Sequence, residues 1–319
     1  MIMKKRILNS QYFFSVLMLI ILIVFSSLLS SSFMRIDNLA TVLRQASVLL
    51  VLCIGLTAVV LTGGIDLSVG STAGLCACIC AKLITEWEIP FYGAIIISLG
   101  LIALVGIFNG FLVGVLQLPA FVATYGSNWV ISGLAVIIMN GQIIYGLPDG
   151  FVQIGVGFIG PVAIPIIIAA VGVIIFYILL QFTTFGRNIY MLGFNAEAAK
   201  FSAMNTLEIT MKCYILSSLM AGIGGIIMAA RLNAADAAMG DVYGLQIVAA
   251  VVMGGTSLLG GVGGVLGTVL GALILTIIVN IMNLVGISAN LQGFAIGIVI
   301  LFMVFVDIYS RNIREAKGI

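Results

Sequence analysis

The chain has 319 residues, of which 62% are hydrophobic and only 8% are charged, and its mean hydropathy is +1.31. A soluble domain of this composition would expose most of its apolar surface, so the composition predicts an all-α polytopic membrane protein. The net charge of +2, with no basic run among aromatic residues, gives no reason to expect nucleic-acid binding. Because the chain has no histidine, imidazole acid–base chemistry and a Ser-His-Asp triad are excluded, which argues against an enzyme.

Apolar stretches recur along the whole chain, and about 20 residues suffice to cross a bilayer. We predict ten spans, near residues 12–33, 40–62, 69–84, 92–116, 120–140, 162–182, 211–230, 244–260, 263–284 and 291–309. The first run is longer than a signal-peptide core and lacks an A-x-A site, so we expect it to be retained. With the basic N-terminus in the cytoplasm, the polar 183–210 connection and the basic C-terminal tail return to the same side, as the positive-inside rule requires. Both termini are therefore expected in the cytoplasm, and since no linker divides the chain, residues 1–319 are expected to form a single integral-membrane domain.

The sequence GGIDLSVGS, which begins at Gly63, sets Asp66 among glycines between two apolar runs. A carboxylate at membrane depth is costly and usually marks function. Gly63, Gly64 and Gly70 loosen the backbone, so the stretch is typical of an interrupted membrane helix at a transport path. Residue chemistry alone leaves another interpretation open, in which Asp66 or Ser68 caps the next helix by accepting a backbone N–H. The predicted topology places Asp66 at or near the cytoplasmic end, between the second and third spans.

Small residues predict close helix packing. The cysteines of the CxCxC run at 76–80 are expected to pack rather than bind metal, because only the first and last share a helix face. Glycines at four-residue spacing on the fourth and ninth predicted spans should let helix backbones approach closely; they are Gly106, Gly110 and Gly114, and Gly263, Gly267 and Gly271. These two spans run in opposite directions and stand five helices apart, as a five-plus-five inverted repeat would require. Coincidence in a glycine-rich chain explains the spacing equally well.

The 183–210 segment is the longest polar connection. Asn195 is a good N-cap and Glu197 follows in the first turn, where the helix dipole favours an anion, so a short surface helix is expected. One interpretation is a solvated connector. The other is a knob that seats in a groove on a cytoplasmic partner, with Phe194 and Phe201 as apolar anchors.

Five short sequences then occur in order. They are GGIDLSVGS from Gly63, LPAFVAT from Leu118, FGRNIYMLGFNAEAAKFSAMN from Phe185, AAVVMGGTSLLGGVGGVLGT from Ala249 and NLVGIS from Asn283. Together they resemble the permease subunit of ribose-type ATP-binding-cassette importers, which handle ribose, xylose, related sugars, autoinducer-2 and nucleosides. The resemblance implies a bacterial plasma (inner) membrane protein that works as one of a pair of permeases. It also implies two cytoplasmic ATPase subunits and an external substrate-binding protein as partners.

The resemblance also implies a cytoplasmic coupling segment. The family pattern Gly-Gly-Asn-Pro-Glu-Ala-Ala falls on residues 193–199, where Phe194 and Ala196 replace the second glycine and the proline. The implied coupling residues are Gly193, Phe194, Asn195, Glu197, Ala198, Ala199 and Lys200. The family's Tyr-Glu-Leu-Asp-Ala-Ile falls on 243–248, and both acidic side chains are missing here.

The expected function is a conduit driven by other subunits. The chain has no G-x-x-x-x-G-K-[ST] phosphate loop, so ATP and Mg²⁺ are expected on the partner ATPases, with no cofactor or metal in this chain. We expect Asp66 to anchor one broken helix and a second glycine group to let another bend. The residues of these two sites are Gly63, Gly64, Asp66, Ser68 and Gly70, and Gly254, Gly255, Gly260 and Gly261. A self-sufficient secondary carrier or channel is the rival function, although no chain of acids suggests a proton relay.

Two further sets of polar residues carry weaker expectations. Arg231, Asp236 and Asp241 suit a segment that receives the binding protein through complementary charges, and a plain extracellular connector is the alternative. Polar residues within the predicted spans could line a hydrated path, although amide side chains also join helices to one another. Those residues are Asn109, Asn128, Asn140 and Asn280, and we rank helix packing first for each of them.

Overall fold

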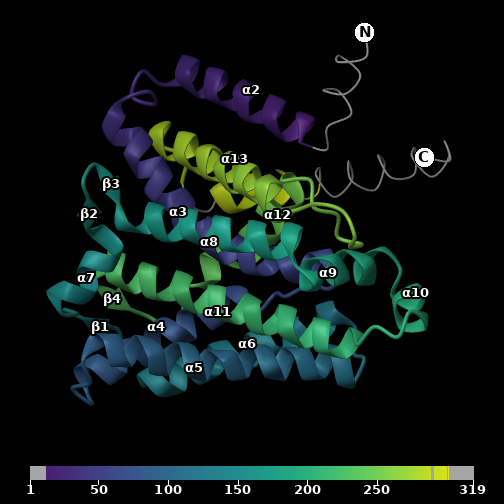
Figure 1. Cartoon of the computed structure of the whole chain (residues 1–319). Helices are drawn as coiled ribbons and strands as arrows, with labels where there is room; N and C mark the ends of the chain where they lie inside the picture. Colours follow the sequence, from purple (N-terminus) through teal and green to yellow (C-terminus); the bar gives the residue numbers. More distant parts are fainter. Residues whose placement is uncertain (1–11, 289–290, 300, 302–319) are drawn as a thin grey trace, which may run out of the picture.

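The protein is a bundle of long helices (Figure 1), and the computed structural model describes residues 12–288, 291–299 and 301. The helices are α2 (Phe13–Leu29), α3 (Ile36–Leu61), α4 (Val69–Thr85), α5 (Phe91–Gly110) with its π-helical continuation η1 (Phe111–Val115), α6 (Ala120–Met139), α7 (Asp149–Val156), α8 (Ile164–Phe182), α9 (Thr184–Phe194), α10 (Ala196–Phe201), α11 (Thr206–Leu232), the 3₁₀ turn η2 (Asp241–Tyr243), α12 (Gly244–Met253) and α13 (Val265–Leu284). Six of them are long and apolar enough to cross a bilayer: α3, α5 with η1, α6, α8, α11 and α13. The predicted all-α membrane fold is therefore confirmed at this level.

Four two-residue strands form two antiparallel pairs. Strand β1 (Ile144–Tyr145) pairs with β4 (Ala234–Ala235), and β2 (Phe158–Ile159) pairs with β3 (Val162–Ala163). Both pairs lie at the end of the bundle opposite α10 (Figure 1). We call the two ends of the molecule the α10 end and the hairpin end.

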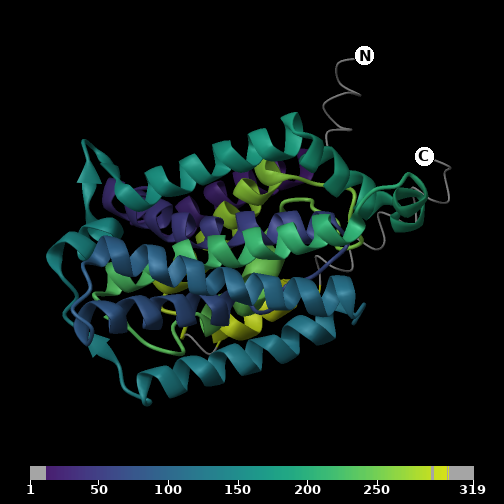
Figure 2. The ribbon, with the colours of Figure 1, turned by 60° about the horizontal axis from the view of Figure 1, so that its bottom comes forward.

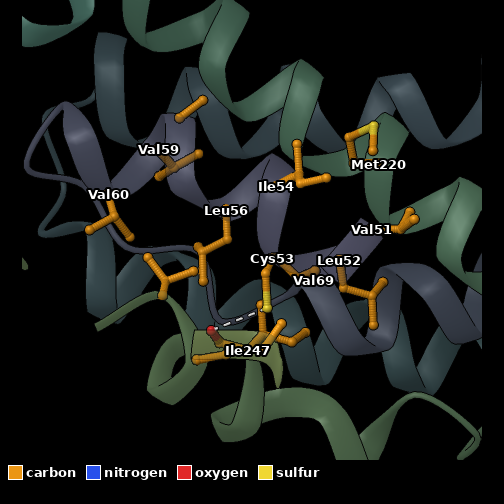
Figure 3. Close-up of a cluster of buried hydrophobic side chains, with 14 of the residues drawn as sticks. Val51, Leu52, Cys53, Ile54, Leu56, Val59, Val60, Val69, Met220 and Ile247 are labelled. Carbon is orange, nitrogen blue, oxygen red and sulfur yellow. Dashed lines mark hydrogen bonds between the residues drawn. The ribbon is translucent and has the colours of Figure 1, made fainter. Parts of the chain in front are cut away.

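The core is centred on α3 and α11. Most of each helix is buried, whereas α5, α6 and α8 expose apolar side chains over most of their length. Helix α11 lies between α5 and α8 in Figure 2 and packs against α3, α4 and α5. Around Leu52, Leu56 and Val59 of α3, apolar side chains from α11 and α12 close the core, including Met220 and Ile247 (Figure 3). Apolar residues on every side of α3 identify an interior helix, and the exposed apolar faces of the outer helices suit contact with lipid.

Small residues pack as the sequence predicts. All five cysteines are buried and free. A Cβ on Gly106 of α5 would lie 2.6 Å from Cα of Ile215 in α11, so α5 approaches that helix backbone to backbone. The glycines of α13 also leave no room for a side chain, but their neighbour is a different helix: Gly271 packs against Ala250 of α12. The two glycine faces therefore pack against helices that an inverted repeat would not make equivalent, and their spacing does not support a repeat.

The structure differs from the prediction in several elements. The predicted span over 244–260 ends at Met253, because Gly255, Gly260 and Gly261 take positive φ angles of 85°, 86° and 73° that no continuing helix can adopt. Helix α7 and strand β2 lie where no element is expected from the sequence, and β3 takes the first two residues of the span predicted over 162–182. The last predicted span, 291–309, lies partly outside the described residues.

Candidate functional site

Helix α10 stands at the end of the bundle as a short, capped projection. Asn195 ends α9 and begins α10, and its Oδ1 accepts the N–H of Ala198 at 2.9 Å. The predicted N-cap is thereby confirmed. Glu197 lies exposed in the first turn of α10 and Lys200 in the last, where each charge complements the helix dipole.

Two large apolar side chains, one just before α10 and one at its end, are left uncovered by the described residues. Phe194 is 83% exposed and Phe201 is 91% exposed, whereas Ala199 on the opposite side is buried against the core. A groove of about 360 Å³ lies beside them, lined by Tyr190, Phe194 and Asn195 among others. Apolar side chains at the end of a helical bundle, next to a groove, are typical of a protein docking surface.

Gly193 joins α9 to both glycine-rich segments. A Cβ on Gly193 would clash with the carbonyl oxygen of Leu61, the last residue of α3, and would lie 2.5 Å from the amide nitrogen of Gly261. The N–H of Gly261 donates to the same Leu61 carbonyl at 2.9 Å, and the Tyr190 hydroxyl donates to Gly263 O at 3.0 Å. The predicted coupling residues and the two predicted broken-helix motifs therefore meet at one point, at the α10 end.

The second glycine group forms the turn between α12 and α13. Gly254 follows the last residue of α12, and its Cα packs against the backbone of Gly267 in α13. Gly260 lies so close to Gly63 that a Cβ would approach its amide nitrogen to 2.6 Å. The group thus holds two helix ends together beside the first motif, at a helix-to-helix turn rather than within one helix.

The first motif is a true interruption, and its chain turns back into the core. Helix α3 ends at Leu61, Gly63 takes a φ of 81°, and α4 starts only at Val69. We call residues 62–68 the re-entrant segment. Gly55 of α3 packs on Ser217 of α11, and Asp66 binds that same serine. Since Gly55 precedes the end of α3 by six residues, Asp66 lies about 9 Å inside the bundle from that end, deeper than the sequence-based topology places it.

Asp66 is buried, with 3% of its surface exposed, and three donors surround it. Its Oδ1 accepts the N–H of Ser68 at 3.0 Å and the Ser68 hydroxyl at 2.6 Å, while its Oδ2 accepts the Ser217 hydroxyl at 2.9 Å. Among the described residues, the ion pairs are Lys82–Glu86 and Lys212–Glu208, so no basic side chain there faces Asp66. The carboxylate therefore joins the start of α4 to α11 through hydrogen bonds alone.

The capping interpretation is partly right. Ser68 is the residue before α4, but its side chain accepts no N–H of the first turn. Asp66 does accept a backbone N–H, that of Ser68 itself. The carboxylate thus orders the chain leading into α4 rather than capping the first turn of the helix.

Side chains from three other helices satisfy the rest of the re-entrant segment. Thr124 of α6 accepts the N–H of Leu67 at 3.1 Å, and the Tyr214 hydroxyl of α11 donates to Ile65 O at 3.1 Å. Asn109 of α5 donates to the Ser68 hydroxyl at 2.8 Å. Irregular backbone inside a membrane is stable only where protein groups or water replace its lost helical bonds, and these contacts replace several of them.

A second chain segment enters the core from the hairpin end. After α11 ends, residues 236–243 pass beside α4, and a Cβ on Gly240 would clash with the carbonyl of Gly70. Gly74 is equally close to this segment, because a Cβ added to it would lie 2.9 Å from the Ala237 carbonyl oxygen. The first turn of α4 and the approach to α12 thus touch backbone to backbone in the interior, which only glycine permits.

Two of the three predicted docking residues lie on this second segment, and the third precedes it. Arg231 is in the last turn of α11 and is half-buried, as is Asp236, whereas Asp241 is exposed. Asp236 accepts the N–H of Ala238, and no ion pair joins the three charges within the described part of the chain. Their exposure differs, and the most accessible of the three is Asp241.

Sequence reasoning missed three contributors to the Asp66 site. Thr124 lies in LPAFVAT, a motif that is recognisable without any role attached to it, and Tyr214 and Ser217 belong to a plain apolar helix. Asn109, ranked as a helix-packing residue, does join α5 to the start of α4. No local pattern marks these residues, because the group that each of them binds lies in a segment far away in the sequence.

Comparison with known proteins identifies the family. Residues 38–304 match the family model described as branched-chain amino acid transport system, permease component. The chain is 36% identical over 287 residues to the ribose import permease protein of Haemophilus influenzae, covering 89% of this chain and 88% of that protein. It is 34% identical over 322 residues to the autoinducer 2 import system permease protein of Salmonella typhimurium, covering 99% and 92%. No solved structure matches the chain significantly. With most of its length matched, the chain belongs to the permease-component family of branched-chain amino acid transport systems.

Proposed function

We propose that this chain is the permease subunit of an ATP-binding-cassette importer that moves a sugar or sugar-like solute into the cell. The ribose and autoinducer 2 import permeases among its relatives support this solute class. The chain is a multi-pass protein of the bacterial inner membrane. In this proposal it works with a second permease, two ATPase subunits that bind ATP and Mg²⁺, and an external substrate-binding protein.

The observation that carries the proposal is the contact of Gly193 with both glycine-rich segments. A partner that holds Phe194 and Phe201 can move α9 and α10 only together with the end of α3 and the α12–α13 turn. The re-entrant segment continues directly from that end of α3, so the movement reaches Asp66 in the core. A binding event at the surface is thus converted into a rearrangement at membrane depth, as alternating access requires.

We further propose ten crossings with both termini in the cytoplasm, on the side of the α10 end. Helices α2 and α4 have 17 residues each, about 26 Å of helix, which crosses most of the hydrocarbon. Helix α12 has only 10 residues, and the segment 236–243 that precedes it supplies the rest of its crossing. The tenth crossing would begin at Leu291. Labelling of single cysteines from outside intact cells tests this topology.

A five-plus-five inverted repeat is part of the same proposal. Asp66 stands two residues before Ser68, which precedes α4, and Asp241 stands two residues before Tyr243, which precedes α12. The chains that carry these acids enter from opposite ends and meet where Gly240 touches the first turn of α4. An inverted repeat would relate two such segments by an axis in the membrane plane.

Arg231, Asp236 and Asp241 lie toward the hairpin end, which faces outward in this topology, and we propose that they receive the binding protein. Reversing both acidic charges should weaken docking of the binding protein and reduce its salt dependence. Unaltered docking at low salt would remove this part of the proposal.

Substitution of Glu197 tests the coupling role. In the assembled importer, Glu197→Arg should reduce solute uptake and the stimulation of ATP hydrolysis, because it places a cation in the first turn of α10. Glu88→Arg, a charge reversal at another exposed glutamate, at the hairpin end, is the matched control and should leave the response to ATP unchanged. Normal uptake by a fully assembled Glu197→Arg complex would contradict the proposal. Transport by the purified chain in liposomes, without ATPase or binding protein, would instead favour a secondary carrier.

A further inference from the structure

A cavity of about 190 Å³, lined by both polar and apolar side chains, lies in the half of the bundle toward the hairpin end, between α3, α11, α12 and α13. Its walls are formed by Gln45, Leu49, Arg231, Val242, Tyr243, Gln246, Leu275, Thr276, Val279 and Gln292. Gln45 lies within the first three turns of α3, and Arg231 in the last turn of α11, so the cavity is separate from the groove beside α10. Val242 at its rim is 67% exposed, so the cavity opens to the surface.

The polar groups of this cavity have unused hydrogen-bonding capacity. Gln45 and Gln246 are half-buried, and within the described residues neither amide makes a hydrogen bond. Arg231 forms no ion pair there either. The Thr276 hydroxyl donates to Ala272 O and keeps its lone pairs free to accept. Polar side chains that converge on one cavity without partners require water or a ligand to bind them.

The chemistry of these groups selects a neutral, hydroxyl-rich ligand. Each glutamine amide offers both donors and an acceptor, and so can bind a hydroxyl group in either role. The remaining wall is apolar, from Leu49, Leu275 and Val279, and suits the C–H face of a sugar ring. A single guanidinium among amides and aliphatic side chains would leave most of the charge of a phosphate or carboxylate cluster unpaired, which disfavours a highly charged ligand.

We propose that this cavity is a binding subsite for an uncharged polyol or monosaccharide, entered from the hairpin end. The subsite rests on the proposed import function, in which it receives the solute before the core rearranges. In this assignment Gln45 of α3 and Gln246 of α12 bind ligand hydroxyl groups. Arg231, which also lines the cavity, can serve the subsite as well as the docking of the binding protein.

Cysteine protection tests the subsite directly. Val242→Cys, at the rim of the cavity, leaves both glutamines in place. This variant of the purified chain in nanodiscs is treated with a membrane-impermeant maleimide, with and without millimolar D-ribose, D-xylose or ribitol. The five native cysteines are buried, so background labelling should be low. We expect Val242→Cys to react and at least one of these polyols to slow the reaction. Tyr145→Cys, on an exposed strand at the same end, is the control whose labelling no polyol should change.

A second substitution separates binding from simple access. In the Val242→Cys background, Gln246→Leu should raise the polyol concentration needed for half-protection by about 5- to 30-fold, the equivalent of losing about 1–2 kcal/mol. Gln246→Asn keeps the amide and should restore part of the protection. If Val242→Cys does not react, or reacts equally with and without every polyol, or if Gln246→Leu leaves protection unchanged, the subsite is refuted. Uptake by the assembled importer tests the proposed function separately: intact uptake without protection overturns only the subsite, and protection without uptake overturns only the import function.

Discussion

Replacing Asp66 distinguishes a hydrogen-bonding role from a role for its charge. Asp66→Leu removes the acceptors of three donors, the Ser68 N–H, the Ser68 hydroxyl and the Ser217 hydroxyl. The two hydroxyls can rotate toward other acceptors, whereas the buried backbone N–H cannot. The expected loss of stability is therefore at least about 1–3 kcal/mol, for one unsatisfied donor, and at most about 3–9 kcal/mol if all three stay unpaired.

Asp66→Asn is the matched variant. Its Oδ1 can still accept both donors of Ser68, and its amide group can donate to the Ser217 oxygen, whose own proton can turn to a carbonyl of α11. We therefore expect a loss within about 1 kcal/mol, the net worth of one ordinary hydrogen bond.

The assay is the temperature at which each purified variant loses its monodisperse size-exclusion peak, followed by uptake in the assembled importer. The leucine variant should aggregate at a clearly lower temperature than the asparagine variant. A leucine variant as stable as the unmodified protein would refute this reasoning about the three donors. An asparagine variant that is stable but inactive would show that transport needs the charge of the carboxylate.

Three other substitutions test close contacts. Gly240→Ala places a methyl group against the backbone of α4 and should destabilise the protein by about 1–3 kcal/mol or more. Gly244→Ala, whose new methyl group would have no neighbour within 4 Å, should be neutral or should stabilise the protein by up to about 1 kcal/mol. Thermal unfolding of the two purified variants in detergent measures the difference. Gly193→Ala should separate α9 from Leu61 and lower uptake more than expression, and an importer with normal ATP-driven uptake would contradict the contact seen here. Thr124→Val leaves the Leu67 N–H without an acceptor and should cost about 1–3 kcal/mol, which unchanged thermal stability would disprove.

The interruption at GGIDLSVGS could be predicted because its cause is local. Gly63 needs a positive φ, and Asp66 is out of place in an apolar run, so both leave a mark on the sequence. The partners of this segment leave no such mark. Tyr214 and Ser217 follow the residues they bind by 149 and 151 positions, and a single polar residue in a long apolar helix can equally be a packing residue.

The depth of Asp66 and the end of α12 illustrate a second limit. Hydropathy shows where a chain enters the membrane, but a re-entrant segment goes in and returns without a polar boundary, so the predicted topology left Asp66 near the cytoplasmic end. The span predicted over 244–260 likewise contains no charged residue. Only the backbone angles of its glycines show that α12 stops at Met253.

The contacts around Asp66 differ in kind from those around Gly193, and the difference bears on how the molecule can move. At Gly193, backbone packs on backbone without room for a methyl group, so we expect α9 and the end of α3 to move together. At Asp66, the links to α11 and α5 run through single hydroxyl and amide side chains, which can exchange partners by rotation. A displacement of α10 should therefore move the end of α3 by a similar distance. The re-entrant segment should accommodate that movement by exchanging its side-chain hydrogen bonds. The rearrangement that opens a path is expected there, where irregular backbone depends on exchangeable side-chain bonds rather than on a helical ladder.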